Sequence, residues 1–124
     1  MNDKRPVNLD IGTFKLPITA YASIAHRISG VVLLLGVAVL LWMLDLSLSS
    51  AAGFEELKST LQSPLCKAII WFVLVGLGYH MIAGVRHLFM DLGFGETLEG
   101  GALGAKVVIV LSVVYAIVMG VWIW

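Results

Sequence analysis

Three long runs of apolar residues restrict what this chain can fold into. They cover about residues 21–48, 65–92 and 104–124, and the last eighteen residues, after Lys106, carry no charge. A helix needs about 20 residues to cross about 30 Å of hydrocarbon, and backbone groups in lipid must bond within their own segment. Each run is therefore predicted to be a membrane-spanning helix. The expected fold is all-α, with a three-helix membrane domain over residues 20–124.

The composition agrees with a membrane protein and argues against a soluble enzyme and a nucleic-acid-binding protein. Of 124 residues, 60% are hydrophobic and 13% are charged, whereas about 25% are charged in a soluble domain. A soluble enzyme is therefore not the default interpretation. Eight basic and eight acidic residues cancel without forming a basic patch, so no nucleic acid is expected as a partner.

The segments between the runs are short and polar. Residues 1–19 are predicted to be a cytoplasmic N-terminal segment, because early charges and the lack of an apolar core argue against a signal peptide. Residues 47–64 are expected to connect the first two helices, with Ser63-Pro64 as a helix start. Residues 91–104 contain five glycines and are predicted to be a flexible polar turn.

Basic residues are unevenly divided between the two sides of the membrane. One side is predicted to hold six of them: Lys4, Arg5, Lys15, Arg27, Arg86 and Lys106. The other side holds Lys58 and Lys67. Cytoplasmic segments carry the excess of Lys and Arg, so the N-terminus is expected to face the cytoplasm.

Among the residues within the predicted spans, His80 is the strongest candidate for a functional role. A neutral imidazole in hydrocarbon needs a hydrogen bond or a metal. Gly76 and Gly84 lie four residues to either side, on the same helical face. A flat macrocycle could lie against this strip with its iron near the imidazole. Equally, the histidine could bond between helices while the glycines allow close packing.

Ser23 and Arg27 lie four residues apart and share one face of the first helix. A hydroxyl donor one turn from a cation suits a ring with carbonyl oxygens, and the cation would stabilise charge as electrons arrive. The alternative is an ordinary helix end, with a snorkelling arginine and Ser23 near the N-cap.

Further polar side chains are expected at the cytoplasmic ends of the first two spans. His26 could bind a carboxylate such as a haem propionate, or could serve interfacial packing. Arg86, His87 and Asp91 are predicted to form a solvated rim of the second helix. The single Cys66 excludes a four-cysteine iron–sulfur cluster within this chain, and no nucleotide-binding glycine motif occurs. If electrons pass through this protein, flavin and iron–sulfur centres must therefore belong to other chains.

Two spaced motifs carry a resemblance to a known family. One runs Arg5-Pro6-Val7-Asn8-Leu9-Asp10 and continues to Ser23-x-x-His26-Arg27-x-Ser29. The other runs His80-x-x-x-Gly84-Val85-Arg86-His87-Leu88-x-Met90-Asp91-x-Gly93. Together with the three-span layout, they resemble the cytochrome b556 membrane-anchor subunits of bacterial succinate dehydrogenase (succinate:quinone oxidoreductase). The resemblance covers essentially the whole chain.

The resemblance implies cofactors, partners and residue roles. His80 would be an axial ligand of haem b, with the second axial histidine supplied by the other hydrophobic anchor subunit. Ser23 and Arg27 would bind ubiquinone, and His26 with Arg27 would lie in the haem-propionate region. A flavoprotein and an iron–sulfur protein would oxidise succinate and deliver electrons at the bacterial inner membrane. No catalytic residue for succinate is expected in this chain, and the motifs fix neither the quinone type nor the direction.

Two other functions compete with this interpretation. A small transporter or proton channel without haem would use His80 as a relay group. Against it, Asp45 and Asp91 both fall near span ends, which leaves no carboxylate within the membrane. A passive assembly anchor without a cofactor would tolerate apolar residues at His80 and Arg27.

Overall fold

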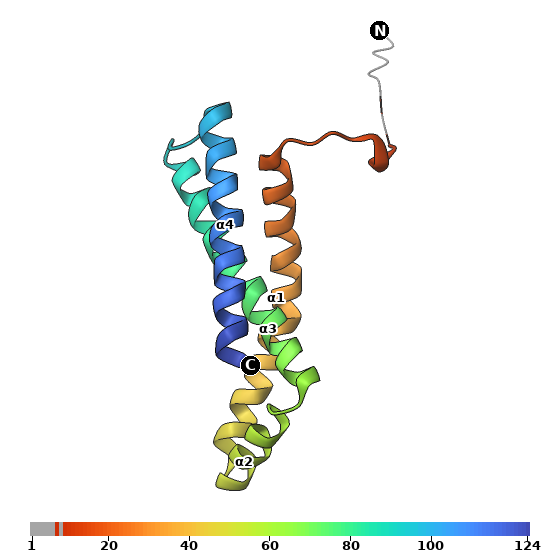
Figure 1. The fold of residues 1–124 in the computed structure, drawn as a ribbon, viewed down its shortest axis with the longest axis vertical. Coiled ribbons are helices and arrows are strands. Elements are labelled where there is room, and N and C mark those ends of the chain that lie inside the picture. The colour runs from red at the N-terminus through yellow and green to blue at the C-terminus, as the bar shows by residue number, and fades with distance from the viewer. Residues whose placement is uncertain (1–6, 8) are drawn as a thin grey trace.

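The computed structural model describes residue 7 and residues 9–124, and its long helices are arranged side by side (Figure 1). A short 3-10 turn, Ile11–Thr13, precedes α1 (Ile18–Ser49), α2 (Ala51–Thr60), α3 (Pro64–Asp91) and α4 (Leu98–Ile123). No strand occurs among the described residues. The all-α prediction is confirmed. Arg5, Pro6 and Asn8 of the predicted N-terminal motif, and Lys4 from the count of basic residues, lie outside the described residues.

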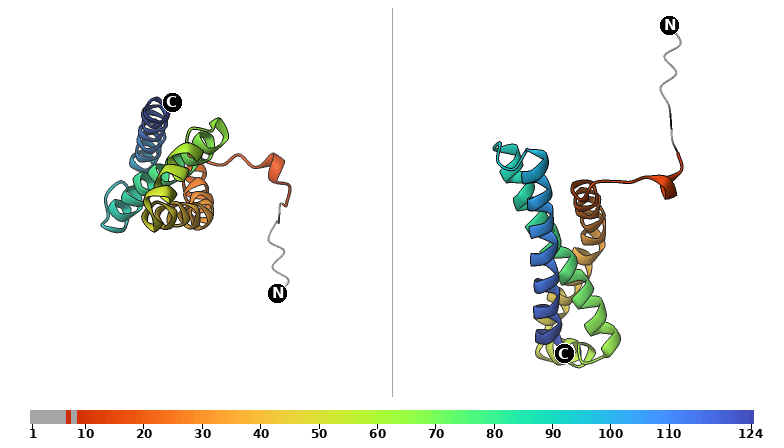
Figure 2. Two further views of the ribbon diagram at one scale, coloured as in Figure 1. Left: turned by 90° about the horizontal axis from the view of Figure 1, so that it is seen from below. Right: turned by 45° about the horizontal axis from the view of Figure 1, so that its top comes forward.

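Three of the helices are long and apolar enough to cross a membrane: α1, α3 and α4. The helix starts follow local rules. Pro17 precedes α1, and Pro64 occupies the first turn of α3, where its missing N–H costs no hydrogen bond. The start of α1 and the α3–α4 connection lie at one end of the bundle, and α2 lies at the other (Figures 1 and 2).

The α3–α4 connection is shorter than predicted, because α4 begins within the expected turn. Only Gly93 and Gly95, with φ of 88° and 71°, adopt the left-handed conformation that a turn requires. Thr97 then caps the helix by accepting a hydrogen bond from the Gly100 N–H at 3.0 Å. The expectation of a turn up to residue 104 was wrong for this reason.

The connection between α1 and α3 contains a helix that was not predicted. Ser50 is extended and accepts a hydrogen bond from the Gly53 N–H at 2.9 Å, so it ends α1 and caps α2. Gly53 is buried where a Cβ would meet the Leu46 carbonyl oxygen. Leu57 is also buried and holds α2 against the end of α1.

The contacts between the long helices rest on small residues, and α3 packs against both α1 and α4. Gly36 of α1 faces Val73 of α3, and Gly78 of α3 lies against the Tyr115 ring of α4. Ala105 is fully buried. Close approach at small residues is the usual way for helices to associate in lipid, where apolar burial gives no driving force.

Candidate functional site

His80 lies within α3, about 24 Å from Pro64 and about 16 Å from Asp91 at 1.5 Å per residue. Its imidazole is directed at α1. The Nδ1 atom lies 3.0 Å from the Ser29 hydroxyl oxygen and 3.2 Å from the His26 carbonyl oxygen. Ser29 itself is buried and donates its hydroxyl proton to the His26 carbonyl at 2.6 Å. The histidine therefore has polar partners on a neighbouring helix.

Three imidazoles gather at this contact between α1 and α3. The rings of His26 and His80 are stacked, with centroids 4.2 Å apart and planes inclined by 13°. The His87 ring lies 4.9 Å from the His26 ring at a tilt of 46°. The Nε2 atom of His26 is buried without a hydrogen-bond partner. The structure thus brings together the histidines that the sequence places in two predicted spans.

The glycine strip around His80 lies against α1. A Cβ at Gly84 would lie 3.5 Å from the His26 Nε2, and one at Gly76 would lie 3.9 Å from Val32. From the opposite side, a Cβ at Gly30 would approach the His80 Cε1 to 3.2 Å. Of the two interpretations of this strip, the structure matches close packing of helices, since α1 covers the strip.

Ser23 and Arg27 lie toward the predicted cytoplasmic end of α1. The Ser23 side chain is half-buried and Arg27 is exposed. Neither side chain forms a hydrogen bond or ion pair with a residue that the structure describes. Arg27 directly follows His26 in the chain, so Ser23 and Arg27 lie next to the histidine cluster. A free hydroxyl and a free guanidinium are therefore available to a molecule outside this chain.

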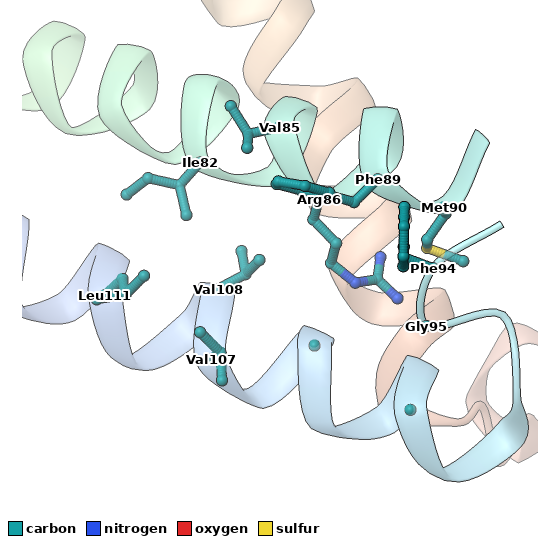
Figure 3. A pocket seen from close by; sticks show the side chains of 12 residues that line it. Ile82, Val85, Arg86, Phe89, Met90, Phe94, Gly95, Val107, Val108 and Leu111 are labelled. Atoms are coloured by element: carbon teal, nitrogen blue, oxygen red, sulfur yellow. The ribbon is translucent and has the colours of Figure 1, made fainter. Parts of the chain in front are cut away.

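The rim predicted for α3 is only partly solvated. The Arg86 guanidinium crosses to α4 and donates to the Gly101 carbonyl at 3.1 Å, at an apolar cavity of about 520 Å³ between the two helices (Figure 3). Asp91 is exposed and does not pair with Arg86. Within residues 9–124 the one ion pair joins Glu55 to Lys58 on α2. The prediction that Arg86 is a solvated end was wrong, because α4 starts early enough to offer it a carbonyl.

Two cross-helix hydrogen bonds have no counterpart in the sequence-based predictions. Tyr79 donates to the Ala22 carbonyl at 2.7 Å and joins α3 to α1. Trp71 donates to the Ala116 carbonyl at 2.9 Å and joins α3 to α4. Each is an aromatic donor within an apolar run, and in lipid such a donor needs an acceptor. The sequence therefore predicts that Tyr79 and Trp71 have acceptors, but it does not show which backbone carbonyls these are.

Comparison with known proteins shows which family the chain belongs to. The chain matches the family described as "Succinate dehydrogenase/Fumarate reductase transmembrane subunit" over residues 1–119. It belongs to this family.

Individual relatives agree over nearly their whole length. A "Succinate dehydrogenase cytochrome b556 subunit" of Coxiella burnetii is 42% identical, with 100% of both chains covered. The protein of the same name from Paracoccus denitrificans is 33% identical over 91% of this chain and 87% of its own. A "Succinate dehydrogenase cytochrome b560 subunit" of Reclinomonas americana is 36% identical, with 95% and 85% covered. The resemblance seen in the motifs is thus confirmed, and this member of the transmembrane family has a multi-pass, three-span architecture.

Proposed function

We propose that this chain is the anchor subunit of a succinate:quinone oxidoreductase that binds haem b through His80 and ubiquinone beside Ser23 and Arg27. A flavoprotein and an iron–sulfur protein would oxidise succinate and pass electrons to the membrane. A second hydrophobic anchor subunit would supply the other axial histidine. The complex would lie in the bacterial inner membrane, with the N-terminus of this chain in the cytoplasm.

The free ring nitrogen of His80 is the observation that carries the haem assignment. Its Nδ1 is occupied by partners on α1, while its Nε2 has no hydrogen-bond partner among the described residues. Nor is Nε2 fully buried within this chain. A neutral imidazole nitrogen open to an adjacent group is what an iron shared between two chains requires.

His26 supports the same assignment from the neighbouring position. Its Nε2 is buried within this chain and unpartnered, which costs free energy. A haem propionate would relieve this cost by accepting a hydrogen bond from the ring, which must turn to present a nitrogen at the surface of the chain. When bound, haem b would supply a one-electron carrier between the two anchor subunits.

Ser23 and Arg27 suit a quinone because of their spacing and their availability. Four residues of helix separate them by about 6 Å, and neither has a partner among the described side chains. The Ser23 hydroxyl would donate to one carbonyl oxygen. The Arg27 guanidinium would stabilise the negative charge that develops there as the quinone takes up two electrons and two protons to become quinol.

The test of the haem assignment is the reduced-minus-oxidised optical spectrum of the purified complex. His80→Ala should abolish the b-type signal while the chain remains in the membrane at its normal level, as measured by immunoblotting. The matched control is His87→Ala, which removes an imidazole from the same cluster and should keep the signal. An unaltered b-type spectrum in the His80 variant would contradict the assignment.

A further inference from the structure

The hydrogen bonds at His80 determine which ring nitrogen carries the proton. A carbonyl oxygen only accepts, so the 3.2 Å contact between Nδ1 and the His26 carbonyl requires an N–H at Nδ1. The Ser29 hydroxyl has a single proton, and it is donated to that same carbonyl. Toward Nδ1, at 3.0 Å, the Ser29 oxygen therefore acts as an acceptor. Both contacts are therefore consistent with a neutral His80 ring that carries its proton on Nδ1.

This tautomer leaves the lone pair of the neutral ring at Nε2. An imidazole protonated at Nδ1 can coordinate a metal only through Nε2. The opposite tautomer would direct a lone pair at two oxygen atoms, one of which has no proton and the other of which has already donated its own. The carbonyl contact on α1 therefore favours the Nδ1–H form.

Packing holds the ring in the same orientation. The His26 ring covers one face of His80, and Gly30 leaves just enough space for Cε1. Ser29 is buried at the centre of this contact, with 7% of its surface exposed. It is the one side chain among the described residues that bonds to the His80 ring; the other partner is a backbone carbonyl.

We propose that Ser29 is a positioning residue for His80: with the His26 carbonyl it accepts the Nδ1–H bond, holds the ring in place and leaves Nε2 for the haem iron. This inference rests on the proposed function and deepens it. Hydrogen bonding at the remote nitrogen of a ligating histidine also raises the basicity of the ligand. A more basic imidazole favours ferric over ferrous iron, so Ser29 is expected to lower the midpoint potential of the haem.

The experiment compares Ser29→Ala with Ser29→Thr in the purified complex. The alanine variant should bind haem about tenfold more weakly, at the lower end of the range for loss of such a partner, because the His26 carbonyl remains. Its haem should have a raised midpoint potential and an altered low-spin electron paramagnetic resonance signal. Ser29→Thr keeps a hydroxyl and should restore both values.

The matched control is Ser112→Ala on α4. Ser112 is also a buried serine, 9% exposed, but it bonds to the Val108 carbonyl of its own helix at 2.7 Å. Its removal should leave the haem potential and resonance signal at wild-type values. Wild-type potential and haem affinity in Ser29→Ala would overturn the positioning role while leaving the His80 assignment intact. Retention of haem by His80→Ala would instead refute the proposed function itself.

Discussion

At the scale of single residues, Arg27 differs from the other arginine near this end of the bundle. Arg86 is half-buried and is engaged by the Gly101 carbonyl of α4, whereas Arg27 is exposed and free of partners among the described residues. A guanidinium held by its own chain serves packing, while an unengaged one beside a half-buried hydroxyl is available to a ligand. This contrast makes Arg27 the residue whose removal should affect quinone chemistry selectively.

Arg27→Ala is expected to lower quinone reduction by about 10²- to 10³-fold, the range for loss of one donor that stabilises developing charge. Oxidation of succinate with an artificial soluble acceptor should stay near its normal rate, because that reaction does not use the membrane site. Steady-state assays of both activities on the same membranes measure the difference.

Lys106→Ala is the control for this prediction, since it removes an exposed cation at the same end of the bundle without touching α1. It should leave both activities unchanged. Equal losses of both activities in the Arg27 variant would mean that the arginine has a structural role.

The histidines of the site could be predicted from the sequence, whereas their connections could not. An ionisable group within an apolar run stands out because it is costly in lipid, and this singles out His80. Ser29 belongs to the sequence motif, but a serine is unremarkable in a membrane helix and often bonds to its own backbone. Only the meeting of α1 and α3 shows that its oxygen reaches a ring 51 residues away.

At the scale of the helices, α3 is the element on which the site depends. It contacts α1 through the His80 and Tyr79 hydrogen bonds, and α4 through the Trp71 and Arg86 hydrogen bonds. Because one helix carries both sets, a shift of α3 relative to α4 also moves the histidine cluster. A disturbance at the α3–α4 contact should therefore reach the proposed haem ligand.

Gly78→Ala is expected to force α3 and α4 apart. A Cβ at this position would overlap the Tyr115 ring, and overpacking of a buried contact costs about 1–3 kcal/mol. That cost exceeds the gain of about 1 kcal/mol in helix propensity from alanine. The thermal midpoint of the purified complex should fall, as measured by tryptophan fluorescence or by loss of the b-type signal.

Gly76→Ala provides the comparison on the same helix. Its Cβ would lie at an ordinary contact distance of 3.9 Å from Val32, so its thermal midpoint should not fall. The double variant Gly78→Ala with Tyr115→Ala should recover part of the loss, because the overlapping ring is gone. If Gly78→Ala is as stable as Gly76→Ala, the prediction is wrong, because the contact between Gly78 and Tyr115 then accommodates a Cβ without loss of stability.

The three long apolar helices were predicted, but the segments between them were not. Apolar runs mark α1, α3 and α4 because lipid demands about 20 such residues. Helix α2 and the first turns of α4 are polar or rich in glycine, and their formation depends on the caps Ser50 and Thr97. A cap is a single side chain with a local hydrogen bond, so hydropathy does not detect it.

At the scale of the whole molecule, the long helices expose many large apolar side chains. Leu34, Leu35 and Val31 on α1, and Val121 and Trp122 on α4, each expose more than two thirds of their surface. A chain with such a surface needs lipid or another hydrophobic subunit around it. This agrees with the proposed second anchor subunit, since no described residue of this chain bonds to His80 Nε2.

The distribution of charge predicts which end of the helix bundle faces the cytoplasm. At the end that holds the start of α1 and the α3–α4 turn, the described cations are Lys15, Arg27, Arg86 and Lys106. The α2 end has Lys58 and Lys67, and Lys58 is paired with Glu55. The excess of cations predicts that the first end faces the cytoplasm. Helix α2 would then lie on the outer side of the membrane.

Single cysteines can test this orientation, because the native chain has only the half-buried Cys66. In a Cys66→Ser background, Ser59→Cys on α2 and Glu96→Cys in the α3–α4 turn each place a thiol at an exposed position. A membrane-impermeant maleimide should label the first in intact spheroplasts, and the second only after lysis and denaturation. The reverse pattern would place α2 in the cytoplasm. Ser23 and Arg27 would then lie at the outer surface, on the opposite side of the membrane from a cytoplasmic iron–sulfur partner, and the proposed electron path to quinone would fail.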